Sequence, residues 1–319
     1  MMEVFVFIQE DNRIVNRNSL EALAGAQSFA KSLNGKVSVI YFGENNEQIA
    51  KYESNRVVAV KNSGLTSYNS QMYLEACQQI FLNYKPDMMN FGHTYQARDW
   101  VPRLSARLDL PLVSDCIGME NQDGIILTRQ IYQGKINTDL RVNGPVLVSV
   151  QSGAYRLDSI QEGRAQIEEF SVNLDNVKRT VHPGKKFQES KGSVDLSRSK
   201  VIVSVGRGIG KEENMPLAKE LADALGAELG SSRPVVDYGW LPHEHQVGSS
   251  GQTVSPKLYL AIGISGAIQH QVGMKGSNNI IAINKDANAP IFEIADIGVV
   301  ADLFEIVPKI IEKIQEFKS

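Results

Sequence analysis

The chain has 319 residues, of which 42% are hydrophobic and 22% charged, and its formal net charge is -3 at neutral pH. This length leaves room for two domains of ordinary size. The slight negative charge and the lack of a basic stretch argue against a nucleic-acid partner. No apolar run approaches the roughly 18 residues that cross a bilayer, so we expect no membrane span.

The two cysteines, Cys77 and Cys116, lie far apart in the sequence. This spacing argues against a disulfide framework and against a cysteine-rich metal or iron–sulfur site. Free thiols are typical of a reducing compartment. The N-terminus leads directly into an apolar stretch without a charged leader, which indicates neither a signal peptide nor a transit peptide. We therefore expect a cytoplasmic protein of bacterial or archaeal type.

Segments with strand and helix character alternate through the first half of the chain. Stretches rich in β-branched and aromatic residues predict strands over residues 3–9, 36–42, 56–61, 86–91 and 145–150. Apolar periodicity predicts helices over residues 18–33, 69–84 and 96–108. Asn18 and Glu21 have the spacing of a capping box at the start of the first helix. The alternation predicts an α/β fold with a mostly parallel sheet and flanking helices.

A polar segment, residues 182–200, contains Pro183, two glycines and four serines, and we interpret it as a linker. It separates a predicted N-terminal domain, residues 1–190, from a C-terminal domain, residues 191–319. Further strands are predicted from Lys200 onward and over residues 256–264, 279–284 and 298–301. Helices are predicted over about 214–225 and over 303–317, the second with a break at Pro308. The second domain is therefore also predicted to be α/β.

The stretch LYLAIGISGAIQHQVG, residues 258–273, is an apolar strand that ends in glycines. In open α/β sheets, ligands bind at the carboxyl ends of strands, against helix N-termini. Gly263 and Gly266 permit close backbone approach, and Ser265 can cap the helix that we expect to begin there. The free N–H groups of that first turn would attract a phosphate or pyrophosphate. The spacing is not that of the GxGxxG dinucleotide fingerprint, and a ligand-free strand–glycine–helix junction is equally open.

Five more polar loops follow predicted strands within about a hundred residues. They are VGRGIG from 205, SSRPVVDYGW from 231, QVGSSGQT from 246, IAINKDANAPIF from 281 and ADLF from 301, where Asp302 has the position of a helix N-cap. Singly, each has an ordinary interpretation as turn glycines, caps or solvated charges. Together they would line one edge of one sheet with hydrogen-bond donors and small residues. Such an edge suits a long ligand that carries phosphates.

Residues 201 to about 318 resemble the FAD-binding part of the α subunit of electron transfer flavoproteins. The densest match is LYLAIGISGAIQHQVGMKGSNNIIAIN, residues 258–284, and GRG, SRPVVD, QVG, NKDANAPIF and ADLF match in order. The first half is similar mainly in ARDWVPRLSARLDLPLVSDCIGME, residues 97–120. The resemblance implies a Rossmann-like C-terminal domain that binds FAD. It also implies an N-terminal domain used for subunit packing.

The resemblance assigns a part of the cofactor to each loop. Residues 265–270 would hold the pyrophosphate and reach the flavin, with His270 beside the C2 carbonyl. Arg233 would lie near the ring, and Ser250 replaces the threonine expected to bond N5. Arg207, Asn284 and Asp302 would hold the ADP half. The implied cofactor-binding set is Arg207, Ser232, Arg233, Gln246, Val247, Gly248, Ser249, Ser250, Ser265, Gly266, Ala267, Ile268, Gln269, His270, Asn284, Asp302 and Leu303.

The implied function is electron transfer without catalytic side chains, because the flavin carries the electrons while the protein sets its binding and potential. The implied partners are an electron transfer flavoprotein β subunit, in a heterodimer, and acyl-CoA or other dehydrogenases. Fatty acid β-oxidation and flavin-based electron bifurcation are the two settings that the resemblance offers. Arg233 and His270 beside the ring would favour its anionic reduced forms.

Two other classes of function stay open. An NAD-dependent oxidoreductase would need a catalytic acid or base and a substrate pocket, and neither is clear in the sequence. An adenine-nucleotide sensor would not need Arg233, Ser250 and His270 together. His243 and His245 lack a third metal ligand nearby. His93 follows a predicted strand and is interpreted as a loop or interface residue, and Trp240 as a packing residue.

Overall fold

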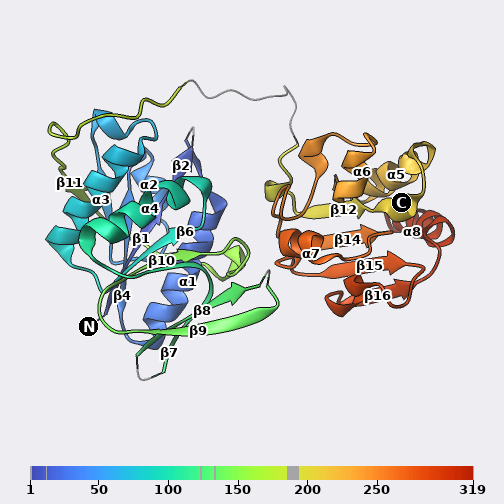
Figure 1. Ribbon diagram of the computed structural model, residues 1–319, viewed down its shortest axis with the longest axis horizontal. Helices are drawn as coiled ribbons and strands as arrows, with labels where there is room; N and C mark the ends of the chain where they lie inside the picture. Colours follow the sequence, from blue (N-terminus) through green and yellow to red (C-terminus); the bar gives the residue numbers. More distant parts are fainter. Residues whose placement is uncertain (1, 12, 123, 133, 185–193, 319) are drawn as a thin grey trace. The chain divides into compact units, whose positions relative to one another are not determined.

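The computed structural model describes residues 2–11, 13–122, 124–132, 134–184 and 194–318 (Figure 1). The chain divides into two compact units, Met1–Lys186 and Phe187–Ser319, here called the first and the second unit. The predicted domain boundary at 190/191 and the middle of the predicted linker fall on residues 185–193, outside the described ranges.

The first unit is built on a nine-stranded sheet of order β11-β5-β4-β1-β6-β10-β7-β8-β9. All pairings from β11 to β7 are parallel, and β7, β8 and β9 pair antiparallel. Its strands are β1 (Glu3–Ile8), β4 (Lys36–Tyr41), β5 (Arg56–Val60), β6 (Met88–Gly92), β7 (Leu112–Asn121), β8 (Ile125–Ile131), β9 (Ile136–Val142), β10 (Val146–Val150) and β11 (Gln166–Phe170). A small hairpin, β2 (Glu10–Asp11) and β3 (Ile14–Val15), follows β1.

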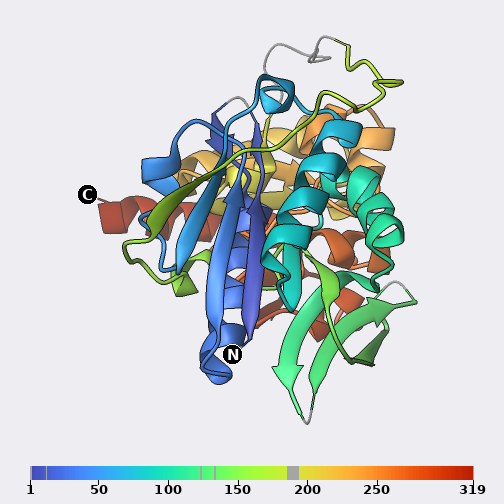
Figure 2. The ribbon, with the colours of Figure 1, turned by 90° about the vertical axis from the view of Figure 1, so that its left-hand side faces the viewer.

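Helices cover both faces of this sheet (Figures 1 and 2). They are α1 (Arg17–Ser32), α2 (Asn46–Ile49), α3 (Ser70–Tyr84) and α4 (Tyr95–Leu108). Along β1, Val4 and Val6 face the core under α1, whereas Phe5 faces the core under α3 and α4. Because both faces are buried, the central strands are apolar without a polar alternation, as parallel sheets require.

The N-cap of the first helix lies two residues before the predicted one. Asn16 is the N-cap of α1, and its side chain accepts hydrogen bonds from the N–H groups of Asn18 and Ser19. The predicted capping box at Asn18 and Glu21 is therefore wrong. Asn18 donates instead to the carbonyl of Val150, and the buried Glu21 carboxylate accepts the N–H of Gly153. Both side chains therefore bond to residues outside the helix. They have the spacing of a capping box, but neither of them caps the helix.

Five predicted strands of the first half are present, with ends shifted by one or two residues. The antiparallel extension β7–β8–β9 and the edge strand β11 were not predicted from the sequence. Much of β9 is exposed on both faces, so its side chains do not alternate between apolar and polar. The strand is specified by pairing with β8 along its whole length, which a local pattern does not reveal.

The second unit has a five-stranded, wholly parallel sheet of order β13-β12-β14-β15-β16. In chain order this is 2-1-3-4-5, a doubly wound α/β arrangement. The strands are β12 (Val201–Val205), β13 (Glu228–Ser231), β14 (Leu258–Ile262), β15 (Ile280–Asn284) and β16 (Ile297–Val300), of which β13 was not predicted. The prediction of mostly parallel sheets with flanking helices is confirmed for both units.

Helices also lie on both faces of the second sheet. Its helices are α5 (Met215–Leu225), α6 (Arg233–Asp237), α7 (Ile268–Met274) and α8 (Leu303–Lys318). Ala218 of α5, Val235 of α6 and Val307 of α8 share one core, while Met274 of α7 belongs to the other. The predicted break at Pro308 is wrong, because α8 continues through it. Pro308 has no N–H to donate, so the main-chain carbonyl four residues before it, in the first turn of α8, lacks its helical hydrogen bond.

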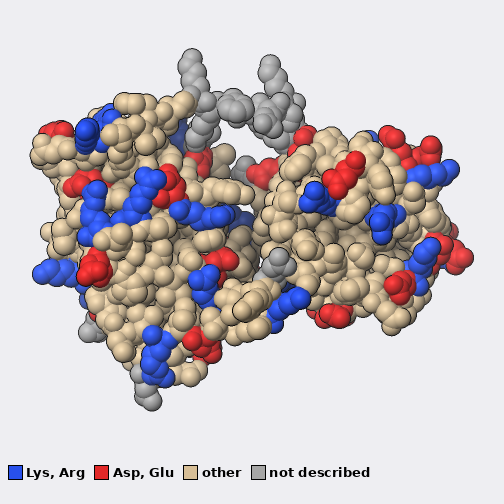
Figure 3. Space-filling view, in the orientation of Figure 1, with Lys and Arg blue, Asp and Glu red and all other residues tan. Residues whose placement is uncertain are grey.

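Charged side chains of both signs are interspersed on the face drawn in Figure 3, in keeping with a net charge near zero. Within the described ranges, none of the helices combines the length and the apolar character that crossing a bilayer requires.

Candidate functional site

The second sheet changes winding direction between the neighbouring strands β12 and β14. The chain leaves β12 toward α5 on one face and leaves β14 toward α7 on the other. The loops after these strands, residues 206–210 and 263–267, therefore diverge from neighbouring points on the carboxyl edge (Figure 1). Such a point is where doubly wound sheets bind their ligands.

Glycines let the two loops touch at the backbone. The N–H of Gly208 donates to the carbonyl of Gly263 over 2.9 Å. A Cβ built on Gly206 would lie 2.2 Å from the same carbonyl oxygen. Gly263 has a φ of +62°, in the left-handed region that favours glycine. The edge at the switch point is consequently bare backbone rather than side chain.

The loop after β14 is held by the loop after β15. Gly266, with a φ of +80°, lies against Ile291, whose N–H donates to the carbonyl of Ser265 over 3.0 Å. The Asn284 side chain donates to the carbonyl of Ile264 over 2.8 Å. Asn284 therefore positions this loop.

The helix after β14 begins later than predicted. Its N-cap is Ala267, without a side-chain cap, and the first helical residue is Ile268. The predicted capping by Ser265 is wrong because the left-handed turn at Gly266 separates that serine from the helix. Among the described residues, the N–H groups of Ala267, Ile268 and Gln269 have no acceptor. These amides form a cluster of donors on the sheet edge, as an anion site needs.

A third glycine loop, residues 246–251, docks on α7. The N–H of Ser249 donates to the carbonyl of Gln269 over 2.7 Å. A Cβ on Gly273 would lie 2.4 Å from the N of Gly248, so contact with the loop needs a glycine in the helix. The buried Gln246 side chain donates to Ser250 Oγ over 2.9 Å. This bond fixes the hydroxyl that the family resemblance places beside the flavin.

His270 lies inside the second unit, with an exposed fraction of 6%. Its Nε2 lies 2.9 Å from the hydroxyl of Tyr259, a partner that sequence reasoning missed although the tyrosine sits in the strand of the motif. Burial lowers the pKa of His270 to about 4, against a weaker opposing effect of the Val247 main chain, so the ring is neutral at neutral pH. The Val247 main chain lies near enough to influence the ring, but no group among the described residues meets hydrogen-bond geometry with the buried Nδ1.

The predicted cationic residues point outward at the same edge. Arg233 begins α6 directly after Ser232, and 68% of its side chain is exposed. Its Nε lies 3.4 Å from Asp237, a surface pair of the kind worth at most about 1 kcal/mol. Arg207, in the turn after β12, is also exposed. Both guanidinium groups can therefore turn toward a ligand at low cost.

The remaining predicted positions close the edge. Asp302 accepts the N–H of Phe304 over 2.8 Å, as the predicted N-cap of α8, while Leu303 is buried in the core. The strand registers pair Val205 with Ser231 and Ile262, and Asn284 with Val300. The loops that follow these strands therefore meet along one edge.

No three histidine, cysteine or acidic side chains come together as metal ligands within the described ranges. His245 Nδ1 instead lies 2.5 Å from the carbonyl of Leu229. Trp240 is half-buried and stacks beside Tyr238 with ring centroids 5.0 Å apart.

Comparison with known proteins gives two matches along the chain. Residues 195–275 match the family described as "Electron transfer flavoprotein FAD-binding domain". Residues 4–175 match the "Electron transfer flavoprotein domain". The FAD-binding match includes the glycine loops after β12 and β14 and the loop that docks on α7. The cofactor of this second unit is FAD.

Relatives align over nearly the whole chain. An electron transfer flavoprotein subunit alpha of Thermoanaerobacterium thermosaccharolyticum is 35% identical, covering 99% of this chain and 98% of that protein. Another, of Bacillus subtilis, is 36% identical over 94% of this chain and 93% of that protein. The "Acryloyl-CoA reductase electron transfer subunit beta" of Anaerotignum propionicum is 33% identical over 99% and 96%. With both halves matched in order, the chain belongs to the α-subunit family of the electron transfer flavoproteins.

Proposed function

We propose that this chain is the FAD-binding subunit of a heterodimeric electron carrier that takes electrons from a dehydrogenase and passes them to an acceptor oxidoreductase. The observation that carries the proposal is the carboxyl edge of the second sheet. It combines a bare backbone at the switch point, unpartnered amides at the start of α7 and the buried, unpartnered Nδ1 of His270. A flavin dinucleotide has groups that match each of these features.

The pyrophosphate of FAD fits the loop after β14. The amides of Ala267, Ile268 and Gln269 would donate to its oxygens, and Gly266 leaves room for the close approach. Arg207 would add a positive charge from the loop after β12. Ser265, Asn284 and Asp302 would contribute to the nucleotide half, Asn284 by holding the loop in place.

The isoalloxazine ring would lie against the loop at residues 246–251 and the start of α6. When bound, FAD supplies the redox chemistry. The Ser250 hydroxyl, held by Gln246, would offer a hydrogen bond to the ring edge. His270 is neutral, so it would contribute a hydrogen bond through Nδ1 rather than a charge. Arg233 would then be the positive charge nearest the ring, and it would favour electron uptake.

The carrier needs no nucleophile or general base of its own, because it only binds and tunes the cofactor. We propose acyl-CoA dehydrogenases as a class of electron donor, because one relative is named as an electron transfer subunit of acryloyl-CoA reductase, which also acts on a CoA thioester. Fatty acid oxidation and electron bifurcation are alternative settings for such a carrier. A place in the cytoplasm stays part of the proposal, supported by two free and buried thiols.

The experiment is to co-express the chain with an electron transfer flavoprotein β subunit from the same source, purify the complex and count its flavins. We expect a stable heterodimer whose flavin is reduced by an acyl-CoA dehydrogenase with substrate and reoxidised by an electron acceptor. A flavin that NADH reduces directly, with a second substrate turned over, would favour an NAD-dependent oxidoreductase instead. A protein that binds ADP but no redox-active flavin would favour the nucleotide sensor.

A further inference from the structure

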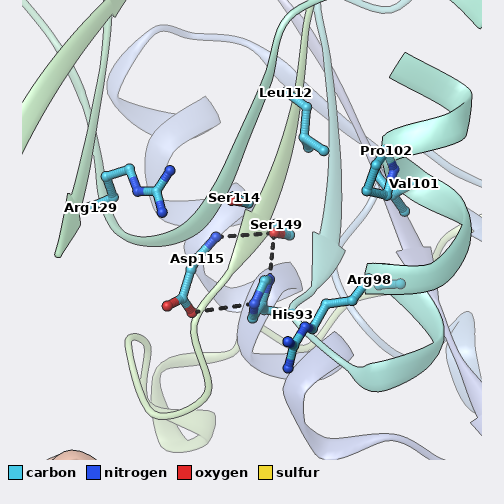
Figure 4. A pocket seen from close by; sticks show the side chains of 10 residues that line it. His93, Arg98, Val101, Pro102, Leu112, Ser114, Asp115, Arg129 and Ser149 are labelled. Atoms are coloured by element: carbon cyan, nitrogen blue, oxygen red, sulfur yellow. Dashed lines mark hydrogen bonds and ion pairs between the residues drawn. The ribbon is translucent and has the colours of Figure 1, made fainter. Parts of the chain in front are cut away.

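A separate cavity of about 350 Å³ lies in the first unit, where the carboxyl end of β6 and strand β10 meet β7 (Figure 4). Residues from α4, β7, β8 and β10 line it, and none of them belongs to the FAD edge. Val101, Pro102 and Leu112 form its apolar part. A volume of this size is within the range of small-molecule sites, roughly 300–1,000 Å³.

An irregularity in the sheet shapes the cavity. Strand β10 pairs Val148 with Val113 but Val150 with Cys116, so β7 carries an extra residue at this point. Asp115, in that bulge, has a φ of +60°, and its N–H donates to Ser149 Oγ over 3.1 Å. Bulges redirect side chains and are frequent beside functional sites. Here the bulge brings Asp115 to the cavity wall.

His93 completes a small polar cluster with Ser149 and Asp115. The Ser149 hydroxyl already accepts the Asp115 N–H, so we assign its proton to His93 Nδ1, 2.8 Å away. The ring proton is then on Nε2, which lies 3.9 Å from Asp115 Oδ1. Burial lowers the pKa of His93, and the positive charges of Arg98 and Arg129 lower it further. The negative charge of Asp115 acts in the opposite direction. The ring is therefore neutral at neutral pH.

Two arginines flank this cluster. Figure 4 shows Arg129, from β8, and Arg98, from α4, on either side of the Asp115–His93 pair. Neither guanidinium has a carboxylate within 4.0 Å or a hydrogen-bond acceptor among the described residues. Arg98 lies 5.5 Å from the ring centroid of Tyr95. Arg129 Nε is buried without a partner, and an unmade buried donor costs about 1–3 kcal/mol.

The charges in the cavity do not balance. The two guanidinium groups are always protonated, the imidazole is neutral, and Asp115 supplies the one carboxylate among the residues that line it. One positive charge is therefore left over. A planar guanidinium binds carboxylate and phosphate oxygens in a fixed geometry, so both arginines are suited to an oxyanion.

We propose that this cavity binds a small organic oxyanion, a carboxylate or a phosphate ester. Its oxygens would lie between Arg98 and Arg129, and its apolar part against Val101 and Leu112. A bound negative charge would also favour the protonated form of His93. Binding and proton uptake are then linked, so that affinity rises as the pH falls through the pKa of the complex.

The test uses the FAD-saturated protein, so that the nucleotide loops of the second unit are occupied. Benzoate and phenyl phosphate are titrated separately by calorimetry at low ionic strength, which distinguishes the two kinds of oxyanion. We expect saturable binding of at least one probe, with one site per chain. Arg98→Gln and Arg129→Gln should each weaken it by about tenfold or more. Arg103→Gln is the matched control, because Arg103 is on α4 but pairs with Asp99 at 2.9 Å.

A second readout is the His93 imidazole, followed by NMR during the titration. A bound probe should raise its pKa, which a purely structural role of the arginines would not do. Absence of saturable binding by either probe at millimolar concentration would overturn the proposal. An equal loss of probe affinity in Arg103→Gln would also overturn it. Loss of probe binding once the β subunit is added would do the same, because a partner side chain would then fill the cavity. Arg98 is exposed, so its variant tests the site even if Arg129→Gln does not fold.

Discussion

Replacing Gly266 by alanine tests whether the loop after β14 has to approach other backbone closely. Gly266 has a φ of +80°, and a Cβ there would lie 2.2 Å from the N and 2.5 Å from the Cα of Ile291. Gly226, which ends α5, has a φ of +62° and nothing within 4 Å of its Cβ position. The two substitutions share the backbone strain, and only the first adds a collision with backbone.

The left-handed conformation costs an alanine roughly 1–2 kcal/mol, so Gly226→Ala should lose about that much stability. Gly266→Ala should lose a further 1–3 kcal/mol or so, because backbone atoms have to move apart. That relief displaces the amides of Ala267 and Ile268, which directly follow Gly266 in the loop. If those amides hold the pyrophosphate, the dissociation constant of FAD should rise by about tenfold or more.

The assay is urea unfolding of the apoprotein, together with FAD titration followed by flavin fluorescence. Gly226→Ala should be destabilised and still bind FAD like the unaltered protein. Gly266→Ala should be less stable and bind FAD more weakly. Equal stability and equal FAD affinity for the two variants would refute the reasoning. The loop would then tolerate a side chain, and the close contact with Ile291 would not matter for the cofactor.

Three further predictions follow from other residues. Arg233→Ala should lower the flavin potential by roughly 40 mV, the one-electron equivalent of about 1 kcal/mol, because solvent screens this exposed charge. Redox titration measures it, with the exposed Lys219→Ala of α5 as control; an unchanged or raised potential would contradict the assignment. The pKa of His270 is about 4 in the folded protein and about 6.5 in the unfolded chain. Because the unfolded state binds the proton first, the free energy of unfolding should fall by up to about 3 kcal/mol as the pH falls from 6.5 toward 4. Urea unfolding at several pH values measures this decrease, which should be smaller in His270→Asn than in His243→Asn. Asn16→Ala should cost about 1 kcal/mol in urea unfolding through loss of the α1 cap, and no change would show that the cap contributes nothing.

Local sequence patterns were enough for the fold class and for the glycine positions of the second unit, whereas its cofactor was implied only by the family resemblance. Runs of β-branched residues marked the buried parallel strands, because a strand covered on both faces has to be apolar throughout. Gly263 and Gly266 stood out because left-handed and crowded backbone positions accept little else. Asp302 was predictable as an N-cap because the bond it makes reaches only two residues along the chain. In each case the cause lies within a few residues of its effect.

Features that depend on distant residues were decided only by the tertiary structure. The partner of His270 is Tyr259, and the N-cap of α1 is Asn16 because Asn18 reaches Val150 instead. The strands β8 and β9 are specified by their pairing rather than by their own alternation. The cavity in the first unit joins His93, Arg129 and Ser149 from separate elements. Each of these contacts forms only when segments far apart in the sequence are packed together, so a local pattern carries no sign of it.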